Sequence, residues 1–405
     1  MTYQETLDFL YDKLPMYQRV GKVAYKKDLT NTLKLLTALG NPHQQLKTVH
    51  IAGTNGKGSS AHAIAAILQL AGYKTGLYTS PHLKNFTERV KIDGVEIKQQ
   101  YVVDFVEKIL SQIEEIKPSF FEITVALAFD YFASQKVDIA VIETGLGGRL
   151  DSTNVLTPEV CLITNIGLDH TDLLGDTLEK IATEKAGIIK SGVPVVVGKY
   201  QAEIQHVFKE KARTVKADLI LAREKNIELS ADLPYYKTAN GPGVVETIGV
   251  LQSIGYAVHQ KHIEEGLLGM EIITSFKGRF QTLQESPKVI ADISHNPDGL
   301  KILFNKVEGL AGGRLFIVFG SVKDKDLVPI FNQFPIDAEL FWTQSNVPRS
   351  LASSALQKLA EIHGLTGDAY ADVDLALTAA KAKAGTDDLI VVTGSTFVVA
   401  DLDGL

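Results

Sequence analysis

The chain of 405 residues is poor in cysteine, tryptophan and methionine, and it lacks long apolar runs. It contains one cysteine, Cys161, one tryptophan and three methionines. A single cysteine excludes an internal disulfide framework and fits a reducing compartment. No segment approaches the ~18 consecutive apolar residues of a membrane span, and the N-terminal residues lack the basic start and apolar core of a signal peptide. We therefore expect no membrane association.

Excess positive charge is missing as well. The formal net charge is −7 at pH 7, whereas binding to a nucleic-acid backbone requires a basic surface. This argues against nucleic acid as the main partner, although a local basic cluster can still bind a small anion. The composition, 45% hydrophobic and 22% charged, is that of a soluble globular protein, and we expect a cytoplasmic enzyme that is a monomer.

Apolar, β-rich segments alternate with helical patterns, which predicts an α/β fold with a mostly parallel sheet covered on both faces. The first series of expected strands lies at 48–52, 75–80, 137–144, 160–166 and 194–198. Helices are expected between them at 59–71, 101–117, 120–135, 176–190 and 201–213, with a small hairpin at 90–97 and a helical, irregular stretch at 223–275.

A second, shorter series of α/β elements begins near residue 288. Its strands are expected at 288–293, 315–320, 339–343 and 389–393, and its helices at 298–308, 352–363 and 373–384. This pattern predicts a smaller, Rossmann-like α/β domain after the first one. We place the first domain at 1–276 and the second domain at 277–405.

The glycine-rich stretch Gly53-Thr54-Asn55-Gly56-Lys57-Gly58-Ser59 joins an expected strand to an expected helix. Its glycines let the backbone approach an anion, and the helix N-terminus and the Lys57 ammonium face the same place. It departs from the standard phosphate-loop pattern, because Ile51 stands at the first glycine and Gly58 separates Lys57 from Ser59. A turn without a ligand is the alternative, but the combination predicts phosphate binding and makes 1–276 a P-loop-type domain.

Ligands of open α/β sheets bind beyond the carboxyl ends of the strands. Three side chains stand at such places: Ser80, Glu143 and His170. Ser80 is either a magnesium ligand or part of a Ser-Pro turn. Glu143 directly follows a buried strand, where phosphate-loop enzymes hold the acid that organises magnesium; the alternative is a glycine loop with a surface ion pair. His170 is a metal ligand, a proton-transfer group or a solvated loop residue.

Other segments leave alternatives open from the residues alone. Ser119 and Glu122 form the pattern of a capping box, and Phe120 and Phe121 suit either the core or a wall for a flat ligand. Lys185 lies on an expected solvated helix face. In the second domain, Asp292 is a ribose acceptor or part of an Asx turn, Arg279 is a candidate phosphate clamp, and 320–326 is a polar loop or a charge cluster.

Taken together, these segments resemble folylpolyglutamate synthase and its bifunctional relative, dihydrofolate synthase, which are ATP-dependent Mur-type amide ligases. The resemblance extends from about residue 20 to the C-terminus. It is carried by seven ordered motifs: GTNGKGS (53–59), TSPHL (79–83), ETGLGGRLD (143–151), DHT (169–171), EKAGI (184–188), GRF (278–280) and DISHNP (292–297). The sequence departs from the family at Lys237, where glutamine is usual, and in the atypical stretch 241–250.

The resemblance implies a set of site residues. For ATP it implies Thr54, Asn55, Gly56, Lys57, Gly58, Ser59, Asn240, Arg279 and Asp292. For two magnesium ions it implies Ser80, Glu143 and His170, and it matches Lys185 to a lysine carried as a carbamate. For the pterin of the acceptor it implies Ser119, Phe120, Phe121, Glu122, Leu150, Asp151 and Ser152.

The activity that the resemblance implies is the ATP-dependent addition of L-glutamate to a reduced folate or to dihydropteroate through an acyl phosphate. Catalytic roles then fall to Lys57, Glu143, His170 and Lys185, and the second domain is expected to close over the nucleotide. Three alternatives are a Mur-type ligase for a cell-wall precursor, an ATPase that works as a conformational switch, and a folate-binding protein without catalysis.

Overall fold

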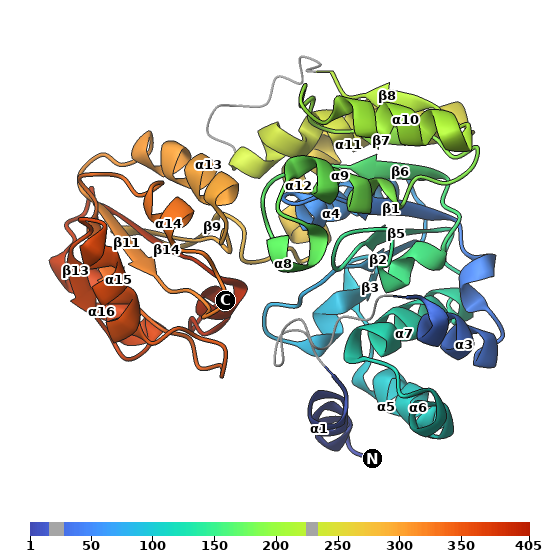
Figure 1. Cartoon of the computed structure of the whole chain (residues 1–405), viewed down its shortest axis with the longest axis horizontal. Coiled ribbons are helices and arrows are strands. Elements are labelled where there is room, and N and C mark those ends of the chain that lie inside the picture. The colour runs from blue at the N-terminus through green and yellow to red at the C-terminus, as the bar shows by residue number, and fades with distance from the viewer. Residues whose placement is uncertain (16–27, 224–233) are drawn as a thin grey trace. The chain divides into compact units, whose positions relative to one another are not determined.

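The computed structural model describes residues 1–15, 28–223 and 234–405 (Figure 1). The chain forms two compact units, Met1–Phe276 and Lys277–Leu405. Within the described residues, no helix combines the length and the apolar character needed to cross a bilayer. Residues 20–27, which belong to the stretch of resemblance, and 224–233 of the expected irregular stretch lie outside the described residues.

The first unit is built on an eight-stranded sheet in the order β4-β3-β2-β5-β1-β6-β7-β8. Its strands are β1 Thr48–Ala52, β2 Thr75–Tyr78, β3 Val90–Ile92, β4 Val95–Glu96, β5 Ile139–Glu143, β6 Val160–Ile163, β7 Val195–Val197 and β8 Leu219–Leu221. The six strands β2, β5, β1, β6, β7 and β8, which are adjacent in this order, pair in parallel. The strands β3 and β4 add an antiparallel edge next to β2. Because β1 lies between β5 and β6, the loops that follow these three strands meet at one edge of the sheet.

Helices cover both faces of this sheet (Figure 1). The helices of the unit are α1 Tyr3–Lys13, α3 Thr30–Ala38, α4 Lys57–Leu70, α5 Gln99–Lys108, α6 Leu110–Ile116, α7 Phe120–Ser134, α8 Thr171–Leu174, α9 Leu178–Ala186, α10 Gln205–Val215, α11 Tyr235–Ser253 and α12 Gln260–Ile273, with short 3-10 turns η2 Pro42–Gln45, η3 Phe86–Arg89 and η4 Ser152–Val155. On one face α4 packs against α11 and α12. On the other, α7 packs on β2 and β5, and α9 and α10 pack on β6 and β7. The buried strands are apolar because both faces are covered.

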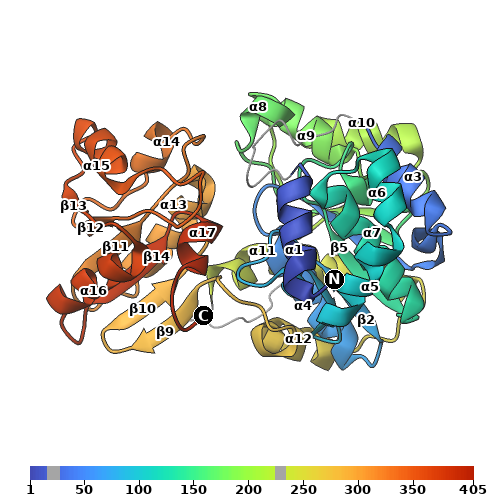
Figure 2. The same ribbon diagram turned by 90° about the horizontal axis from the view of Figure 1, so that it is seen from below.

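The second unit repeats this architecture on a smaller scale around a six-stranded sheet, β13-β12-β11-β14-β10-β9 (Figure 2). Its strands are β9 Gln281–Glu285, β10 Lys288–Ala291, β11 Leu315–Phe319, β12 Glu339–Trp342, β13 Gly367–Ala369 and β14 Leu389–Thr393. Its helices are α13 Pro297–Glu308, α14 Val328–Phe331, α15 Ser353–Ile362, α16 Val373–Lys383 and α17 Thr396–Ala400. Only β9 runs antiparallel to its neighbour.

The expected α/β fold with mostly parallel sheets is confirmed, and the central strands lie where the sequence places them. Two details differ. The single helix expected at 101–117 is two helices, because Ile109 has φ −107° and ψ 12°. The strands β8, β9 and β13 were not expected; they lie at sheet edges and are only partly buried.

Candidate active site

The glycine loop between β1 and α4 is shaped by its protein neighbours. Gly53 has φ +154°, and a Cβ there would lie 1.8 Å from Thr164 Oγ1. Gly56 caps α4 with φ +82°, and a Cβ there would lie 2.2 Å from Asn240 Oδ1. Both positions therefore require glycine before any ligand binds. Gly58 is not required in this way, because a Cβ added there would lie 3.6 Å from a Glu143 carboxylate oxygen, which is an ordinary contact distance.

Residues after β6 hold the start of this loop. The amide of Thr54 donates to the Asn165 carbonyl at 2.9 Å, and the amide of Asn55 donates to Asn165 Oδ1 at 3.1 Å. The Asn55 carbonyl accepts from Thr164 Oγ1 at 2.6 Å and from Asn165 Nδ2 at 2.9 Å. The Thr54 hydroxyl also bonds to Gly167. Sequence reasoning missed Thr164 and Asn165, because the backbone groups of the glycine loop that they hold lie more than a hundred residues away in the chain.

Lys57 begins α4, two residues earlier than the sequence indicates. Its Nζ donates to the Thr54 carbonyl at 3.3 Å, so the side chain folds back over the loop. The amides of the first helical turn have no acceptor within their own helix, and the helix dipole makes this end positive. The start of α4 thus has the properties of an anion-binding site.

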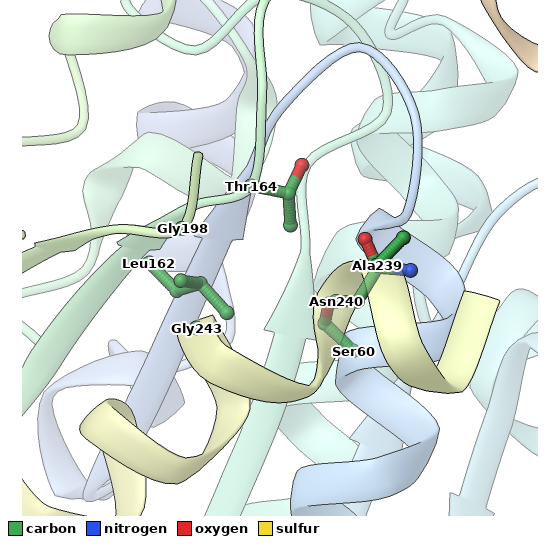
Figure 3. Close-up of a pocket in the computed structure, with 7 residues that line it drawn as sticks. All are labelled: Ser60, Leu162, Thr164, Gly198, Ala239, Asn240 and Gly243. Carbon is green, nitrogen blue, oxygen red and sulfur yellow. The ribbon is translucent and has the colours of Figure 1, made fainter. Parts of the chain in front are cut away.

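Asn240 reaches the same loop from α11. Its Nδ2 donates to Ser59 Oγ at 2.9 Å, and Ser59 Oγ in turn donates to the Gly56 carbonyl at 3.1 Å. Figure 3 shows Asn240, Ser60 and Thr164 around a small pocket, which is also lined by Leu162, Gly198, Ala239 and Gly243. The structure therefore places Asn240, an expected nucleotide-binding residue, directly against the glycine loop.

The expected metal ligands are placed by the ends of β2, β5 and β6. Glu143 is the last residue of β5 and is 5% exposed. Its Oε2 accepts the backbone amide of Ser80 at 3.1 Å, so these two residues are brought together. His170 is the N-cap residue just before α8 and lies in the left-handed region, with φ 50°. Its Nε2 lies 4.0 Å from Asp169 Oδ2.

No cage of three or more histidine, cysteine or acidic side chains exists in the described part of the chain. A metal held here by Glu143 and Ser80 would need further oxygen ligands from phosphate or water. Magnesium binds in this way, through few carboxylates together with substrate phosphates. The donor set therefore fits magnesium.

Lys185 lies near the end of α9 with its side chain buried. Its Nζ donates to the Gly53 carbonyl at 2.8 Å, which brings it to the base of the glycine loop. Burial, together with the nearby charge of Lys57, lowers the pKa of Lys185 from 10.5 to about 7. The solvated helix face that the residues alone indicated is thus wrong for Lys185, because the last turn of α9 packs onto the sheet.

The loop that follows β5 packs closely on the end of α9. A Cβ on Gly148 would lie 2.9 Å from the carbonyl oxygens of Glu184 and Lys185. Arg149 pairs with Glu184 at 2.8 Å, so the surface ion pair exists, although its acid is not Asp151. Asp151 is 3% exposed and accepts the Leu146 amide at 2.8 Å and the Thr153 amide at 3.0 Å.

Burial raises the pKa of Asp151, and hydrogen bonds from Thr153 and Leu146 act in the opposite direction. Leu150 precedes it and is partly buried, whereas Ser152 follows it in η4 and is buried. The expected pterin-binding residues of this loop therefore lie in a turn that the Asp151 carboxylate closes through the amides of Leu146 and Thr153.

The capping box at the start of α7 is confirmed. The Ser119 amide donates to Glu122 Oε2 at 2.6 Å, and the Glu122 amide donates to Ser119 Oγ at 3.2 Å. The two phenylalanines differ. Phe120 is 3% exposed, whereas Phe121 is partly exposed and its ring tip would lie 2.5 Å from a Cβ on Gly145.

A buried arginine lies beside Phe120. The Arg89 guanidinium is centred 5.2 Å from the Phe120 ring, and its Nε donates to His82 Nδ1 at 2.8 Å. Arg89 is 3% exposed. Sequence reasoning missed it, because the hairpin that follows carries no polar pattern that marks a site. It adds a cation next to the aromatic side chains of α7.

In the second unit, Asp292 follows β10 and is fully buried. Its Oδ2 accepts the Phe280 amide and its Oδ1 accepts the Ser294 amide, both at 2.8 Å. Phe280 has φ 45°, so Asp292 holds the turn that carries Arg279. In the 320–326 loop, Asp324 pairs with Arg349 at 2.5 Å, which makes part of that charge local.

Two protein-family models match the chain. The model of the Mur ligase middle domain matches residues 51–241, and that of the Mur ligase glutamate ligase domain matches residues 278–396. Together with the two α/β units and the glycine loop, these matches define a Mur-type ligase.

The relatives narrow this class. The dihydrofolate synthase/folylpolyglutamate synthase of Bacillus subtilis is 31% identical over 430 residues, covering 99% of this chain and 98% of the relative. Escherichia coli FolC in complex with DHPP and ADP has a TM-score of 0.84 and 29% identity, over 99% of this chain and 96% of that one. A bifunctional folylpolyglutamate synthase/dihydrofolate synthase with Mn, AMPPNP and L-glutamate bound has a TM-score of 0.85 and 29% identity, over 99% and 97%. The chain belongs to the folylpolyglutamate synthase/dihydrofolate synthase family.

Proposed function

We propose that the protein is an ATP-dependent amide ligase that adds L-glutamate to a reduced folate and to dihydropteroate, with release of ADP and phosphate. The observation that carries the proposal is the meeting of three strand ends. The glycine loop after β1 is contacted by Asn165 after β6, and Glu143 at the end of β5 lies against Gly58. The similarity to the relatives over the whole chain supports the same activity.

The reaction begins with the carboxylate of the acceptor. One of its oxygens attacks the γ-phosphorus of ATP, the bond to the bridging oxygen breaks, and an acyl phosphate and ADP form. Both reactants are anions, so the attack requires positive charge near the phosphates. Lys57 and the first turn of α4 provide it. The neutral amine of L-glutamate then attacks the acyl carbon, a proton leaves the nitrogen, and phosphate departs.

Magnesium fits the oxygen donors at the end of β5, with Ser80, Glu143 and His170 as its proposed ligands. When bound, magnesium neutralises and orients phosphate oxygens. Glu143 is held for this role by the Ser80 amide. A Cβ at position 58 would lie near its carboxylate, so Gly58 leaves the space between loop and acid free.

We further propose that Lys185 is carried as a carbamate. A neutral amine is required to add carbon dioxide, and a pKa of about 7 makes much of Lys185 neutral near that pH. The addition forms an N–C bond, releases a proton and turns a buried cation into an anion. An anion suits this place, because the positive charge of Lys57 lies nearby.

The acceptor and the nucleotide use different surfaces of the site. For the pterin ring we propose Phe121, Asp151 and Ser152, with Ser119, Phe120, Glu122 and Leu150 supporting them. The half-exposed ring of Phe121 against Gly145 offers a flat apolar wall. For ATP we propose Thr54 to Ser59 with Asn240, and in the second unit Arg279, positioned by Asp292.

Product analysis tests this function. The protein is incubated with ATP, magnesium and L-glutamate, with dihydropteroate or tetrahydrofolate offered separately, and products are weighed by mass spectrometry. A mass gain of one glutamyl residue is expected with each acceptor, and no gain with either one refutes the proposal. The Lys57→Ala variant should keep its fold and lose turnover. Lys47→Ala is the matched control, because Lys47 is an exposed lysine that precedes β1, at the end of that strand opposite the glycine loop.

A further inference from the structure

A buried chain of hydrogen bonds connects the middle of β1 to the loop after β5. His50 Nε2 lies 2.8 Å from Thr153 Oγ1, and Thr153 Oγ1 donates to Asp151 Oδ1 at 2.5 Å. His50 and Thr153 are fully buried, and Asp151 is 3% exposed. These hydrogen bonds thus connect the core of the sheet to Asp151 in the loop after β5 (residues 145–151), which we call the acceptor loop.

The direction of the protons in this chain follows from the partners. Besides Thr153 Oγ1, the carboxylate of Asp151 receives two backbone amides, which are donors only. The single hydroxyl proton of Thr153 points to Asp151, so the hydroxyl oxygen must accept from His50. His50 is therefore the tautomer with its proton on Nε2. Burial lowers the pKa of His50 to about 3, so the ring is neutral.

The other ring nitrogen supports a dedicated role for this contact. Among the described residues, His50 Nδ1 is buried without a hydrogen-bond partner. A buried polar atom left in this way is costly. An apolar side chain at the same position in the core of β1 would avoid this cost, unless the Nε2–H donor of His50 is needed.

The hydrogen bond from His50 to Thr153 bears on the shape of the acceptor loop. Asp151 Oδ2 accepts the Leu146 amide and thereby closes the turn that runs from Gly145 to Asp151. Phe121, the proposed wall for the pterin ring, packs on Gly145 of this turn. Rotation of the Asp151 carboxylate would therefore disturb both the position of Asp151 and the packing of the Phe121 ring on Gly145.

We propose that His50 is a positioning residue for the acceptor: through Thr153 it fixes the Asp151 carboxylate and the 145–151 turn in the arrangement that binds the pterin ring. This inference rests on the proposed function, because it takes a pterin-bearing acceptor as the ligand of the turn. His50 does not touch the substrate. It acts through the Thr153 hydroxyl alone.

Steady-state kinetics with paired variants test the role. His50→Leu and Thr153→Val remove the donor and the relay, whereas His50→Gln and Thr153→Ser keep a donor or hydroxyl at the same reach. We expect the first pair to raise the KM for the acceptor about tenfold, with KM for ATP and for L-glutamate within about twofold. The second pair should restore it. The double variant should be no worse than either single one, because both break the same chain.

His43→Leu is the matched control, since His43 is also buried with an unpartnered Nδ1 but contacts Phe129 rather than the acceptor loop. It should leave the acceptor KM unchanged, because it does not touch the hydrogen bonds that reach Asp151. If His50→Leu behaves like this control while wild-type enzyme is active, the positioning role is refuted. If Leu at position 50 prevents folding, Thr153→Val, which conserves volume, decides in the same way.

A spectroscopic measurement separates this inference from the proposed function. In protein labelled with ¹⁵N-histidine, His50 should show a proton on Nε2 at neutral pH, and Thr153→Val should shift that signal. A proton on Nδ1, or a signal unchanged by Thr153→Val, overturns the relay whatever the activity. Wild-type protein that shows the expected tautomer but adds no glutamate would refute the proposed function instead.

Discussion

The close approach between Gly56 and Asn240 makes a quantitative prediction about the phosphate-binding loop. Replacing Gly56 by alanine forces an L residue to φ +82° and puts its Cβ 2.2 Å from Asn240 Oδ1. The backbone conformation alone costs about 1 kcal/mol. The Asn240 side chain must also move away, which breaks its 2.9 Å hydrogen bond to Ser59 and costs about 1 kcal/mol more. We expect a total loss of about 2 kcal/mol in the free energy of unfolding.

A double-mutant cycle separates the two costs. In an Asn240→Ala background the clash and the hydrogen bond are already gone, so Gly56→Ala should cost only the backbone term of about 1 kcal/mol. Urea unfolding measures the stability, and the KM for ATP measures the loop. Gly72→Ala is the control, since Gly72 has φ +88° but no neighbour within 4 Å of its Cβ position. Its cost should be independent of Asn240. Strictly additive effects of Gly56→Ala and Asn240→Ala would refute the reasoning.

Three further predictions concern titration and charge. At fixed dissolved ¹³CO₂, the NMR signal of a carbamate on Lys185 should grow from pH 6 to pH 8, because the amine with a pKa of about 7 becomes neutral in that range. The Lys185→Met variant should lack this signal, and a signal that survives the substitution contradicts the assignment. His50 has a folded pKa of about 3 against about 6.5 when unfolded, so its neutral form contributes stability that is lost as pH falls from 6.5 toward 3, and His50→Leu should flatten this part of the urea-unfolding profile. Glu143→Gln keeps an acceptor for the Ser80 amide but removes the charge, so turnover should fall at least ~100-fold with an unchanged melting temperature; turnover near the wild-type rate would exclude Glu143 as a metal ligand.

The central strands were predictable from the sequence because burial on both faces leaves an unbroken apolar run, as in Ile139-Ala140-Val141-Ile142 of β5. The edge strand β13, Gly367-Asp368-Ala369, has no such signal, since one side of an edge strand is not covered by a neighbour. Its residues are also poor strand formers, so only pairing with β12 defines it as a strand.

The candidate site likewise has features that neighbouring residues in the sequence determine and features that depend on contacts between distant residues. Lys57 and the helix that follows it were predictable because the turn, the lysine and the helix start are contiguous. The contacts that give the loop its shape were not, since Asn240 is 181 residues from Ser59 and Asn165 is 110 residues from Asn55. The burial of Lys185 likewise depends on where α9 packs, which its charged sequence does not indicate.

The contacts of the glycine loop also decide which of its groups remain for the phosphates. The amides of Thr54 and Asn55 already donate to Asn165, so they do not provide the donors that a glycine-rich cradle usually offers. The amides in the first turn of α4 have no acceptor within their own helix, and the Lys57 ammonium has two N–H donors besides the one directed at Thr54. Because the helix dipole and the lysine charge act at this one place, phosphate binding should depend more on Lys57 and the first turn of α4 than on the loop that precedes them. The glycines at 53 and 56 are then needed for fitting Thr164 and Asn240, whereas a Cβ at position 58 would meet Glu143 only at an ordinary contact distance of 3.6 Å.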